Sequence, residues 1–177
     1  NPEVSIIIPA HNKVEATYYC ICSILTAYNS TTYEIIVVDD GSSDETSQLE
    51  QFISGIKVVR HEEQQRFIKA CNAGFQHAKG DYIVLLNNDT EVTGGWLDEL
   101  KQAFTRFDKV GAVGSKLLYP DGTLQAAGGI VWGSGNPWNY GTGHNAFDPR
   151  FTYARQVDYI CGAALMTPRR VWEQVGG

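Results

Sequence analysis

Four short apolar runs in the first half of the chain predict buried strands. Each run is rich in branched aliphatic side chains. Each ends at a proline or is followed directly by polar residues. The runs lie at residues 4–9, 34–38, 56–59 and 82–86, and a further apolar stretch at 110–118 predicts a fifth strand. Strands that are apolar throughout are typical of a mostly parallel sheet covered on both faces.

Apolar residues recur at helical spacing between these runs, which predicts helices. The first helix is expected to bury the face formed by Val14, Tyr18, Ile21, Leu25 and Tyr28. Further helices are expected around residues 49–53, 67–78 and 97–107. The alternation of strands and helices predicts an α/β domain with a mostly parallel, Rossmann-like sheet and helices on both faces.

Local signals mark where some of these helices begin and end. Asp44 is expected to cap the second helix, and Gly80 to stop the third, which carries Cys71, Gly74 and Phe75 on one face. Thr167 and Pro168 predict the start of a last helix that runs through Val175, because threonine caps helices and proline favours their first turn. The stretch before it, residues 128–143, is rich in glycine and tryptophan, so we expect a loop-rich second half.

Composition narrows the class of protein. The chain has 177 residues, 43% of them hydrophobic, with 14 Lys and Arg against 20 Asp and Glu, a formal charge of −6. These proportions predict one compact globular domain. A net acidic chain without a basic run is a poor match for nucleic acid or an anionic membrane, so neither is expected as a partner. No apolar run approaches the ~20 residues of a membrane-spanning helix.

Cysteine usage and the first residue bear on the compartment. The four cysteines have no CxxC spacing, which predicts reduced, largely buried thiols and a cytoplasmic protein. The chain begins at Asn1 without a methionine, so flanking segments are expected to be absent from it. Any contact with the inner face of a membrane would be made by such regions.

Polar clusters follow three of the predicted strands. They are Pro9–Asn12, Asp39–Ser42 and Asn87–Thr90. Ligands of parallel sheets bind at the carboxyl ends of the strands, so these clusters are expected to converge on one cleft. Turn formation alone would explain any single cluster, but three together indicate a site.

The cleft lacks the usual phosphate-binding sequences, since neither GxGxxG nor GxxxxGK[ST] occurs. A phosphate ligand would meet several carboxylates there, which requires a bridging divalent metal. Asp89 is the expected metal ligand because it would end a buried strand. Asn87 lies two residues earlier, so strand alternation would place it on the same side.

Four segments resemble the family 2 glycosyltransferases and together cover nearly the whole chain. They are IIIPAHN (6–12), EIIVVDDGSSDET (34–46), ACNAGFQHAKGDYIVLLNNDTEV (70–92) and DYICGAALMTPRRVWEQVGG (158–177). The resemblance implies a single GT-A-type domain over residues 1–177, with a nucleotide-sugar-binding half (1–92) and an incomplete acceptor-side half (93–177). It implies inverting transfer from a UDP- or dTDP-sugar, with Mn²⁺ or Mg²⁺, to a glycan or lipid-linked acceptor in cell-surface polysaccharide synthesis.

The resemblance also implies roles for individual residues. The donor would be bound by Pro9, Ala10, His11, Asn12, Asp40, Asn72, Asn88 and Asp89, and the metal by Asp89 and Asn87. Asp40 would accept the ring N–H that uracil and thymine have and cytosine lacks. His11 would stack on the base or lie as a solvated loop residue, and Asn12 would shape the loop. Asp39 is expected to anchor the turn through the N–H groups of residues 41 and 42.

The chain departs from the family pattern at several points. Asn87 replaces the first carboxylate of the DxD motif, so metal binding should depend on the phosphates of the donor. Arg66 is either a diphosphate clamp or, as we favour, a solvated residue at a helix start; Lys69 and Lys116 are equally ambiguous. Residues 128–143 either line the acceptor side with aromatic rings or anchor a loop through buried tryptophans.

The catalytic base is a further gap. Inverting transfer needs a carboxylate that takes the proton of the acceptor hydroxyl. In the family that this chain resembles, this acid follows a Gly-Gly-Phe-Asp turn. In this chain that turn would lie beyond Gly177. Asp158 and Glu173 are the nearest acids, and neither is assigned to the role.

Three other classes of protein remain open. A receiver domain would use Asp39, Asp40 and Asp89 around magnesium, but its ~120 residues leave the second half unexplained. A phosphohydrolase with a DxDxT motif would need a carboxylate at Asn87, and an amide cannot form the phosphoenzyme. A non-catalytic nucleotide-sugar sensor would keep the same donor site.

Overall fold

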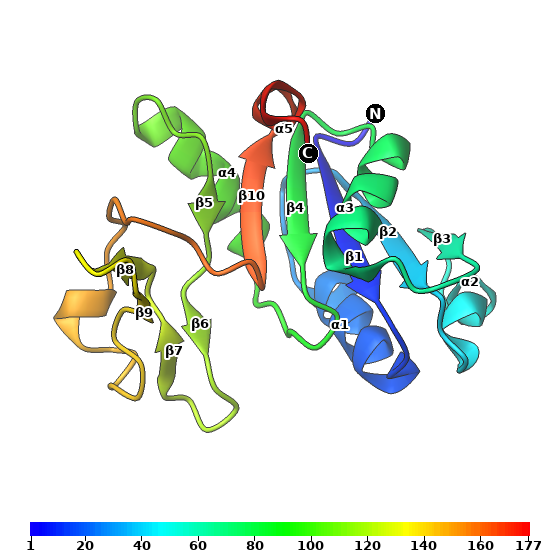
Figure 1. The fold of residues 1–177 in the computed structure, drawn as a ribbon, viewed down its shortest axis with the longest axis horizontal. Coiled ribbons are helices and arrows are strands. Elements are labelled where there is room, and N and C mark those ends of the chain that lie inside the picture. The colour runs from blue at the N-terminus through cyan, green and yellow to red at the C-terminus, as the bar shows by residue number, and fades with distance from the viewer.

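A six-stranded sheet forms the centre of the computed structural model, which describes all 177 residues (Figure 1). The strand order is β3-β2-β1-β4-β10-β5. β1 to β4 are parallel, and β10 runs antiparallel to both of its neighbours. The strands are β1 (Val4–Ala10), β2 (Tyr33–Asp40), β3 (Ile56–His61), β4 (Tyr82–Leu86), β5 (Val113–Gly114) and β10 (Ala164–Pro168).

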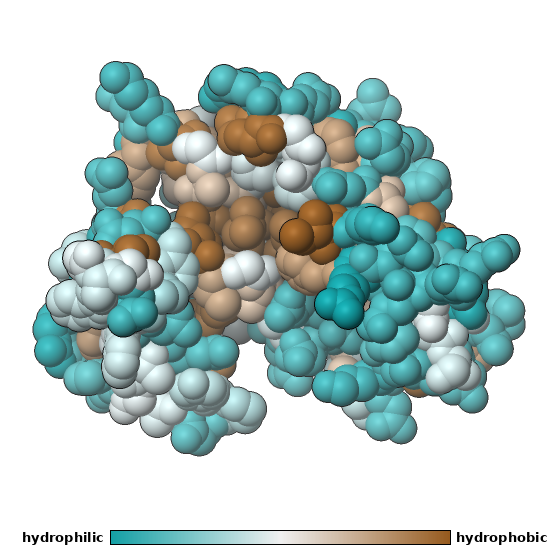
Figure 2. Space-filling model, in the orientation of Figure 1, coloured by the Kyte–Doolittle hydropathy of each residue, from teal (hydrophilic) through white to brown (hydrophobic).

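Helices cover both faces of the sheet, as expected. They are α1 (Val14–Thr26), α2 (Leu49–Phe52), α3 (Arg66–His77), α4 (Trp96–Arg106) and α5 (Arg169–Val175), with 3₁₀ turns η1 (Glu45–Gln48) and η2 (Pro149–Phe151). α1, α2 and α4 contribute to one apolar cluster, while α3 and Trp172 of α5 pack into the other. Figure 1 shows α3 in front of the sheet. Figure 2 shows apolar surface over β4 and β10, beside α3.

Strand alternation decides which face each buried side chain joins. Ile6 and Ile8 of β1 pack with α1 and α4, whereas Ile7 packs with α3. β2 follows the same rule over residues 35–38. Continued to the end of β2, the alternation places Asp39 toward the α1 face and Asp40 toward the α3 face. The two adjacent carboxylates therefore have different surroundings.

The buried face of α1 differs from the expected one. Tyr18, Leu25 and Tyr28 are exposed, and the helix buries Thr17, Cys20, Ile21 and Ile24. The apolar spacing gave the wrong face because Thr17 and Cys20, a polar and a thiol side chain, have partners in the loop after β4. The expected buried face of α3, with Cys71 and Gly74, is confirmed.

Two other elements of the second half have bounds that differ from the expected ones. The stretch 110–118 forms only β5 and the two-residue β6 (Leu117–Leu118) instead of one strand. The helix expected to run through Val175 is present as α5, but it begins at Arg169 with Pro168 as its N-cap residue. Thr167 and Pro168 themselves pair with β4 as the end of β10. The Thr167 hydroxyl donates to the carbonyl of Gly111 at 2.8 Å and caps nothing.

A loop-rich lobe lies beside β5 and is built from two small antiparallel ribbons. These pair β6 with β7 (Leu124–Ala126) and β8 (Gly129–Val131) with β9 (Pro137–Asn139). Trp132 and Trp138 are 55% and 62% exposed, so they do not anchor a core. Figure 2 shows the surface hollowed at its lower edge, between this lobe and the part that contains α1.

The cysteine side chains are free in the structure, and two of them are buried. Burial raises the pKa of Cys20 to about 11 and that of Cys71 to about 12. Both thiols therefore stay protonated and unreactive at neutral pH. Among the helices, none combines the length and the apolar character needed to cross a bilayer.

The strand order also excludes the receiver domain. Receiver domains have the parallel order 2-1-3-4-5, in which the third strand follows the first across the sheet. Here β2 lies between β3 and β1, and β4 is on the other side of β1. The sheet is mostly parallel with helices on both faces, as expected.

Candidate functional site

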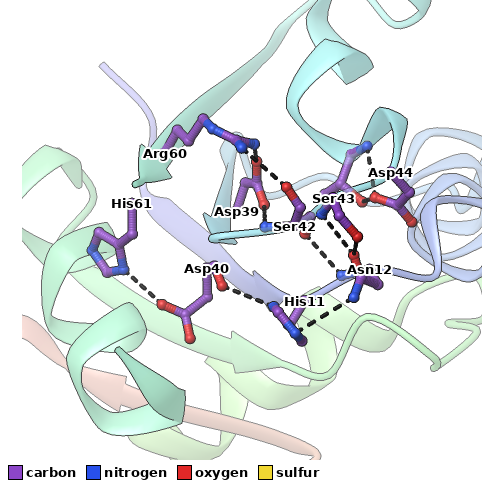
Figure 3. Close-up of polar contacts among 10 residues, drawn as sticks. His11, Asn12, Asp39, Asp40, Ser42, Ser43, Asp44, Arg60 and His61 are labelled. Carbon is purple, nitrogen blue, oxygen red and sulfur yellow. Dashed lines mark hydrogen bonds and ion pairs between the residues drawn. The ribbon is translucent and has the colours of Figure 1, made fainter. Parts of the chain in front are cut away.

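The carboxyl ends of β1, β2 and β4 meet at one edge of the sheet, as the sequence predicts. Ala10 pairs with Asp39 in the sheet, and Asp40 pairs with His61 at the end of β3. Ala10 is itself buried, so Pro9 and Ala10 form the strand end that carries the loop with His11. The polar clusters that follow β1 and β2 are thus neighbours in space (Figure 3).

Asp39 holds the turn after β2. Its Oδ1 accepts the N–H of Ser42 at 2.9 Å, and its Oδ2 forms an ion pair with Arg60. Arg60 also donates to the Ser42 carbonyl at 3.0 Å. The carboxylate is fully buried, so the expected turn-anchoring role is confirmed for Ser42. The Gly41 N–H makes no such bond, and Arg60 is a partner that the sequence analysis missed.

Asp40 lies against the start of α3 and is surrounded by donors. Its Oδ1 accepts His61 Nδ1–H at 2.7 Å and the Gln65 N–H at 2.8 Å, and its Oδ2 accepts the Arg66 N–H at 2.7 Å. Burial raises the pKa of the Asp40 carboxyl, but the donors of His61, Gln65 and Arg66 outweigh it, and the pKa lies below its usual value. The carboxylate therefore stays ionised and available as an acceptor at neutral pH.

The loop after β1 is tied to the loop after β2. His11 Nδ1 lies 2.9 Å from the carbonyl oxygen of Asp40. Asn12 donates its N–H to Ser42 Oγ at 2.8 Å and accepts the Ser43 N–H at 2.8 Å. Asn12 thus shapes the loop, as expected, while the exposed ring of His11 stays beside Asp40 (Figure 3).

Asp44 links two helix starts. It caps η1, the 3₁₀ turn directly before α2, through the N–H of Thr46 at 3.0 Å, whereas the N-cap residue of α2 itself is Gln48. Its Oδ2 also accepts the N–H of Val14 at 2.9 Å and so caps α1, whose own N-cap residue, Lys13, provides no side-chain bond. The same carboxylate therefore fixes the loops after β1 and β2 together.

The Asn87–Asp89 segment is a turn and does not continue the strand. β4 ends at Leu86, so strand alternation does not govern Asn87 and Asp89, and the reasoning that placed them on one side was wrong. Thr90 Oγ1 donates to the Asn87 carbonyl at 2.7 Å and closes the turn. The Asp89 side chain is exposed and accepts no hydrogen bond from the protein. Its carboxylate is therefore free to bind a ligand.

Two side chains of α1 form hydrogen bonds that hold this turn in place. Asn88 Nδ2 donates to Thr17 Oγ1 at 3.0 Å, and Cys20 Sγ donates to the Asn87 carbonyl at 3.6 Å. Neither Thr17 nor Cys20 is expected in this role from the sequence. The available signal was that two non-aliphatic residues, Thr17 and Cys20, are three positions apart and therefore lie on the same face of one helix.

Asn72 lies apart from the other predicted donor residues. It lines a hollow of about 360 Å³ with Phe75, Trp172, Glu173 and Gly177, between α3 and α5. The exposed side chain of Arg66 makes no hydrogen bond, as expected of a solvated helix-start residue. Lys69 and Lys116 bond to the protein itself, to Gln65 Oε1 at 2.9 Å and the Ala146 carbonyl at 3.0 Å.

The side chains at this edge of the sheet fit a metal ion that binds only together with a phosphate-bearing ligand. Nowhere in the chain do three or more His, Cys, Asp or Glu side chains form a group that could hold a metal ion. Asp89 offers one unpartnered carboxylate, and the Asn87 side-chain amide is also without a hydrogen bond. Two such ligands leave most coordination positions of Mn²⁺ or Mg²⁺ to diphosphate oxygens and water.

Gly41 permits the close approach that holds Asp40, and its replacement by alanine is expected to be costly. Its φ is +72°, and an added Cβ would lie 2.7 Å from the Gln64 nitrogen. Gly55, with φ of +82° and open space around it, is the matched control for backbone strain alone. We expect Gly41→Ala to lower the free energy of unfolding by about 1 to 3 kcal/mol. In urea unfolding this loss should exceed that of Gly55→Ala, and equal losses would show that the contact with Gln64 is unimportant.

Comparison with known families and sequences gives a consistent result. A model of the family described as glycosyl transferase family 2 matches residues 5–175. The chain is 33% identical over 188 residues to an uncharacterized protein of Sinorhizobium fredii, a match that covers 99% of this chain and 20% of that protein. It is 31% identical over 185 residues to the O-antigen biosynthesis protein RfbC of Myxococcus xanthus, covering 99% of this chain and 14% of RfbC. The chain thus spans a fifth or less of these two relatives.

Solved structures support the same fold. A mannosyltransferase from Pyrobaculum calidifontis, in complex with GDP-Man and Mn²⁺, superposes with a TM-score of 0.68 at 16% identity. This match covers all of the present chain and 47% of the mannosyltransferase. TarS of S. aureus in complex with UDP matches with a TM-score of 0.52 at 22% identity, over 59% of this chain and 32% of TarS.

Proposed function

The chain belongs to glycosyl transferase family 2, and from this premise we propose that it carries the donor site of an inverting glycosyltransferase. The enzyme would move a sugar from a UDP- or dTDP-sugar to a glycan or lipid-linked acceptor in cell-surface polysaccharide synthesis. The observation that carries the proposal is the meeting of His11, Asp40 and the unpartnered Asp89 at the carboxyl edge of one sheet. Metal-bound and nucleotide-bound relatives of the same fold support it.

Asp40 is proposed to recognise the base. Its carboxylate has four acceptor positions, of which His61, Gln65 and Arg66 use three. The remaining position is on Oδ2, since Oδ1 already accepts twice. A ring N–H such as N3–H of uracil or thymine would complete the set, whereas cytosine presents an acceptor at the same ring position. This chemistry favours UDP and dTDP over CDP.

His11 is proposed to stack on the base. A carbonyl oxygen only accepts hydrogen bonds, so the contact between His11 Nδ1 and the Asp40 carbonyl requires the proton on Nδ1. Nε2 faces Asn12 Nδ2 at 3.4 Å. Both ring nitrogens are thus directed toward the protein, and the exposed face of the ring is left for a ligand.

Asp89 and Asn87 are proposed to hold Mn²⁺ or Mg²⁺ together with the diphosphate. The bound cation would neutralise the diphosphate and make it a better leaving group. The protein's own part is to hold the turn in place through Thr17, Cys20 and Thr90. Asn72 and Asn88 stay proposals for donor contact, although Asn88 uses its amide to reach Thr17 and Asn72 lies beside α5.

The half from residue 93 onward is proposed to form the acceptor side. Trp138 lies on β9, Trp132 follows directly after β8, and both are exposed. Flat aromatic faces pack well on sugar C–H surfaces. Asp158 uses its carboxylate to hold the N–H of Val131 at 2.9 Å, and Glu173 lies on α5. We assign neither acid as the general base, and we propose that the base comes from another part of the protein.

Two narrower points complete the proposal. A cytoplasmic location is proposed because the chain is expected to use an activated sugar nucleotide and to keep its thiols reduced. Any membrane contact would be made elsewhere in the protein. A non-catalytic nucleotide-sugar sensor would share this donor site and differ only in lacking transfer.

A thermal-shift panel tests the proposal. UDP, dTDP and their sugars should stabilise the chain in Mn²⁺ and lose most of that effect in EDTA, because the acidic edge cannot hold a diphosphate without a cation. CDP and ADP, whose bases lack the ring N–H, should stabilise it less. Equal shifts with and without EDTA would contradict the metal role, and no shift with any nucleotide would contradict the donor site. Release of UDP from a UDP-sugar by the full-length protein, which would include the proposed general base, would separate a transferase from a sensor.

A further inference from the structure

The last two residues of β3 lie opposite the aspartate pair that ends β2. In register, Asp39 faces Arg60 and Asp40 faces His61. Side chains at paired positions of neighbouring parallel strands point to the same side of the sheet. Arg60 therefore reaches Asp39, and His61 reaches Asp40 on the α3 side (Figure 3). Each carboxylate has its own basic partner from β3.

His61 is the only side chain that bonds to the Asp40 carboxylate. The other two donors, from residues 65 and 66, are backbone N–H groups of the α3 start. His61 Nδ1 lies 2.7 Å from Oδ1, and the two side chains are 19% and 6% exposed. A carboxylate oxygen only accepts, so His61 carries its proton on Nδ1. The histidine thus fixes which oxygen of Asp40 is saturated by the protein.

We propose that His61 is a positioning residue for base selection, acting through Asp40. By occupying Oδ1 it holds the plane of the carboxylate so that the unfilled acceptor position of Oδ2 is the one offered to the ring N–H of the base. The inference rests on the proposed function of Asp40. A pyrimidine or purine with a ring N–H next to a carbonyl would be favoured through this geometry, and a base with a ring acceptor there would be rejected.

A pair of substitutions separates the hydrogen bond from the bulk of the ring. His61→Asn keeps an N–H donor where Nδ1 lies and removes the ring. His61→Phe keeps the ring and removes the donor. The readout is the ratio of the dissociation constants of CDP and UDP, measured by calorimetry in Mn²⁺. His77→Phe is the control, because His77 is exposed at the far end of α3 and its side chain hydrogen-bonds only to Lys57.

The proposal predicts that His61→Phe lowers the CDP-to-UDP ratio by about fivefold or more, whereas His61→Asn and His77→Phe keep it within about twofold. It also predicts that His61→Phe changes the ratio no further when Asp40 is already asparagine. A packing role would give the reverse order, with His61→Asn the damaging variant, and would overturn the proposal. So would a fall in both affinities at a constant ratio.

The same measurements show whether the positioning role of His61 or the proposed function itself is wrong. If Asp40→Asn removes the discrimination and His61→Phe does not, Asp40 reads the base and the positioning role of His61 is wrong. If the wild-type chain binds CDP and UDP equally, base selection by Asp40 is wrong, and the inference about His61 falls with it.

Discussion

Replacing Asp89 with alanine is expected to abolish the metal-dependent part of nucleotide binding. In Mn²⁺ and UDP at 100 times the dissociation constant, the wild-type chain should gain about 2.7 kcal/mol in its free energy of unfolding. Asp89 offers the one unpartnered carboxylate of the turn after β4, and the chain has no cluster of three ligating side chains to replace it. Asp89→Ala should therefore show the same small shift in Mn²⁺ as in EDTA.

The fold should survive this substitution. The Asp89 carboxylate is exposed and bonds to no protein group, so urea unfolding of the ligand-free variant should match that of the wild type. Asp108→Ala is the matched control, because Asp108 is also an exposed aspartate without a hydrogen bond, in the turn after α4. A variant that retained the Mn²⁺-dependent shift would refute the role of Asp89. Loss of cooperative unfolding would indicate a structural role instead.

Asp40→Asn is expected to weaken UDP binding by roughly 1.5 to 3 kcal/mol, since it replaces a charged acceptor of the base N–H. The substitution also disturbs the start of α3. Wherever the new amide N–H₂ is placed, it faces either the Gln65 N–H or the Arg66 N–H, and one of these backbone donors loses its acceptor. A loss of stability of about 1 to 3 kcal/mol should accompany the loss of affinity.

Comparison with CDP separates the two effects of this substitution. A general loosening of the loop would weaken both nucleotides equally. Loss of base recognition would weaken UDP alone, and the amide could donate to the ring nitrogen of cytosine. We expect isothermal titration to show the CDP-to-UDP ratio of dissociation constants falling by about tenfold or more. An unchanged ratio would mean that Asp40 supports the loop without reading the base.

Most of the parallel half of the fold was predictable from local pattern. Apolar runs located each end of β1 to β4 to within two residues, because strands covered on both faces are rich in apolar side chains. β10 was not predictable, since its antiparallel pairing with β4 depends on partners about 80 positions away in the sequence. That pairing also explains why Thr167 and Pro168, which carry the local signal of a helix start, end a strand.

The face of α1 shows a different limit. Aromatic residues such as Tyr18 and Tyr28 satisfy the helical period but lie outside, while Thr17 and Cys20 lie inside because the turn after β4 needs their hydrogen bonds. Hydrophobicity alone cannot rank a buried threonine above an exposed tyrosine. Which of the two side chains is buried depends on a hydrogen-bond partner that is distant in the sequence and is brought close only by the fold.

The candidate site was predictable in its acidic residues and not in its supports. Strand ends located Asp40 and Asp89, because ligands of parallel sheets bind at that edge. The partners Arg60 and His61 required the register between β2 and β3, which no local pattern contains. The strand itself ends at Leu86 as expected, but strand alternation does not extend to Asn87 and Asp89, since a turn held by Thr90 begins directly after Leu86.

The central claim is the place where the nucleotide binds, and amide chemical-shift mapping tests it most directly. On addition of UDP and Mg²⁺ to the ¹⁵N-labelled chain, the account predicts that the largest shifts fall on residues 10–13, 40–43, 65–67 and 87–90. The amides of the β8–β9 ribbon should stay unchanged. Shifts concentrated on α5 or in the ribbon would contradict the account, as would saturating UDP that moves no amide at the carboxyl edge of β1, β2 and β4.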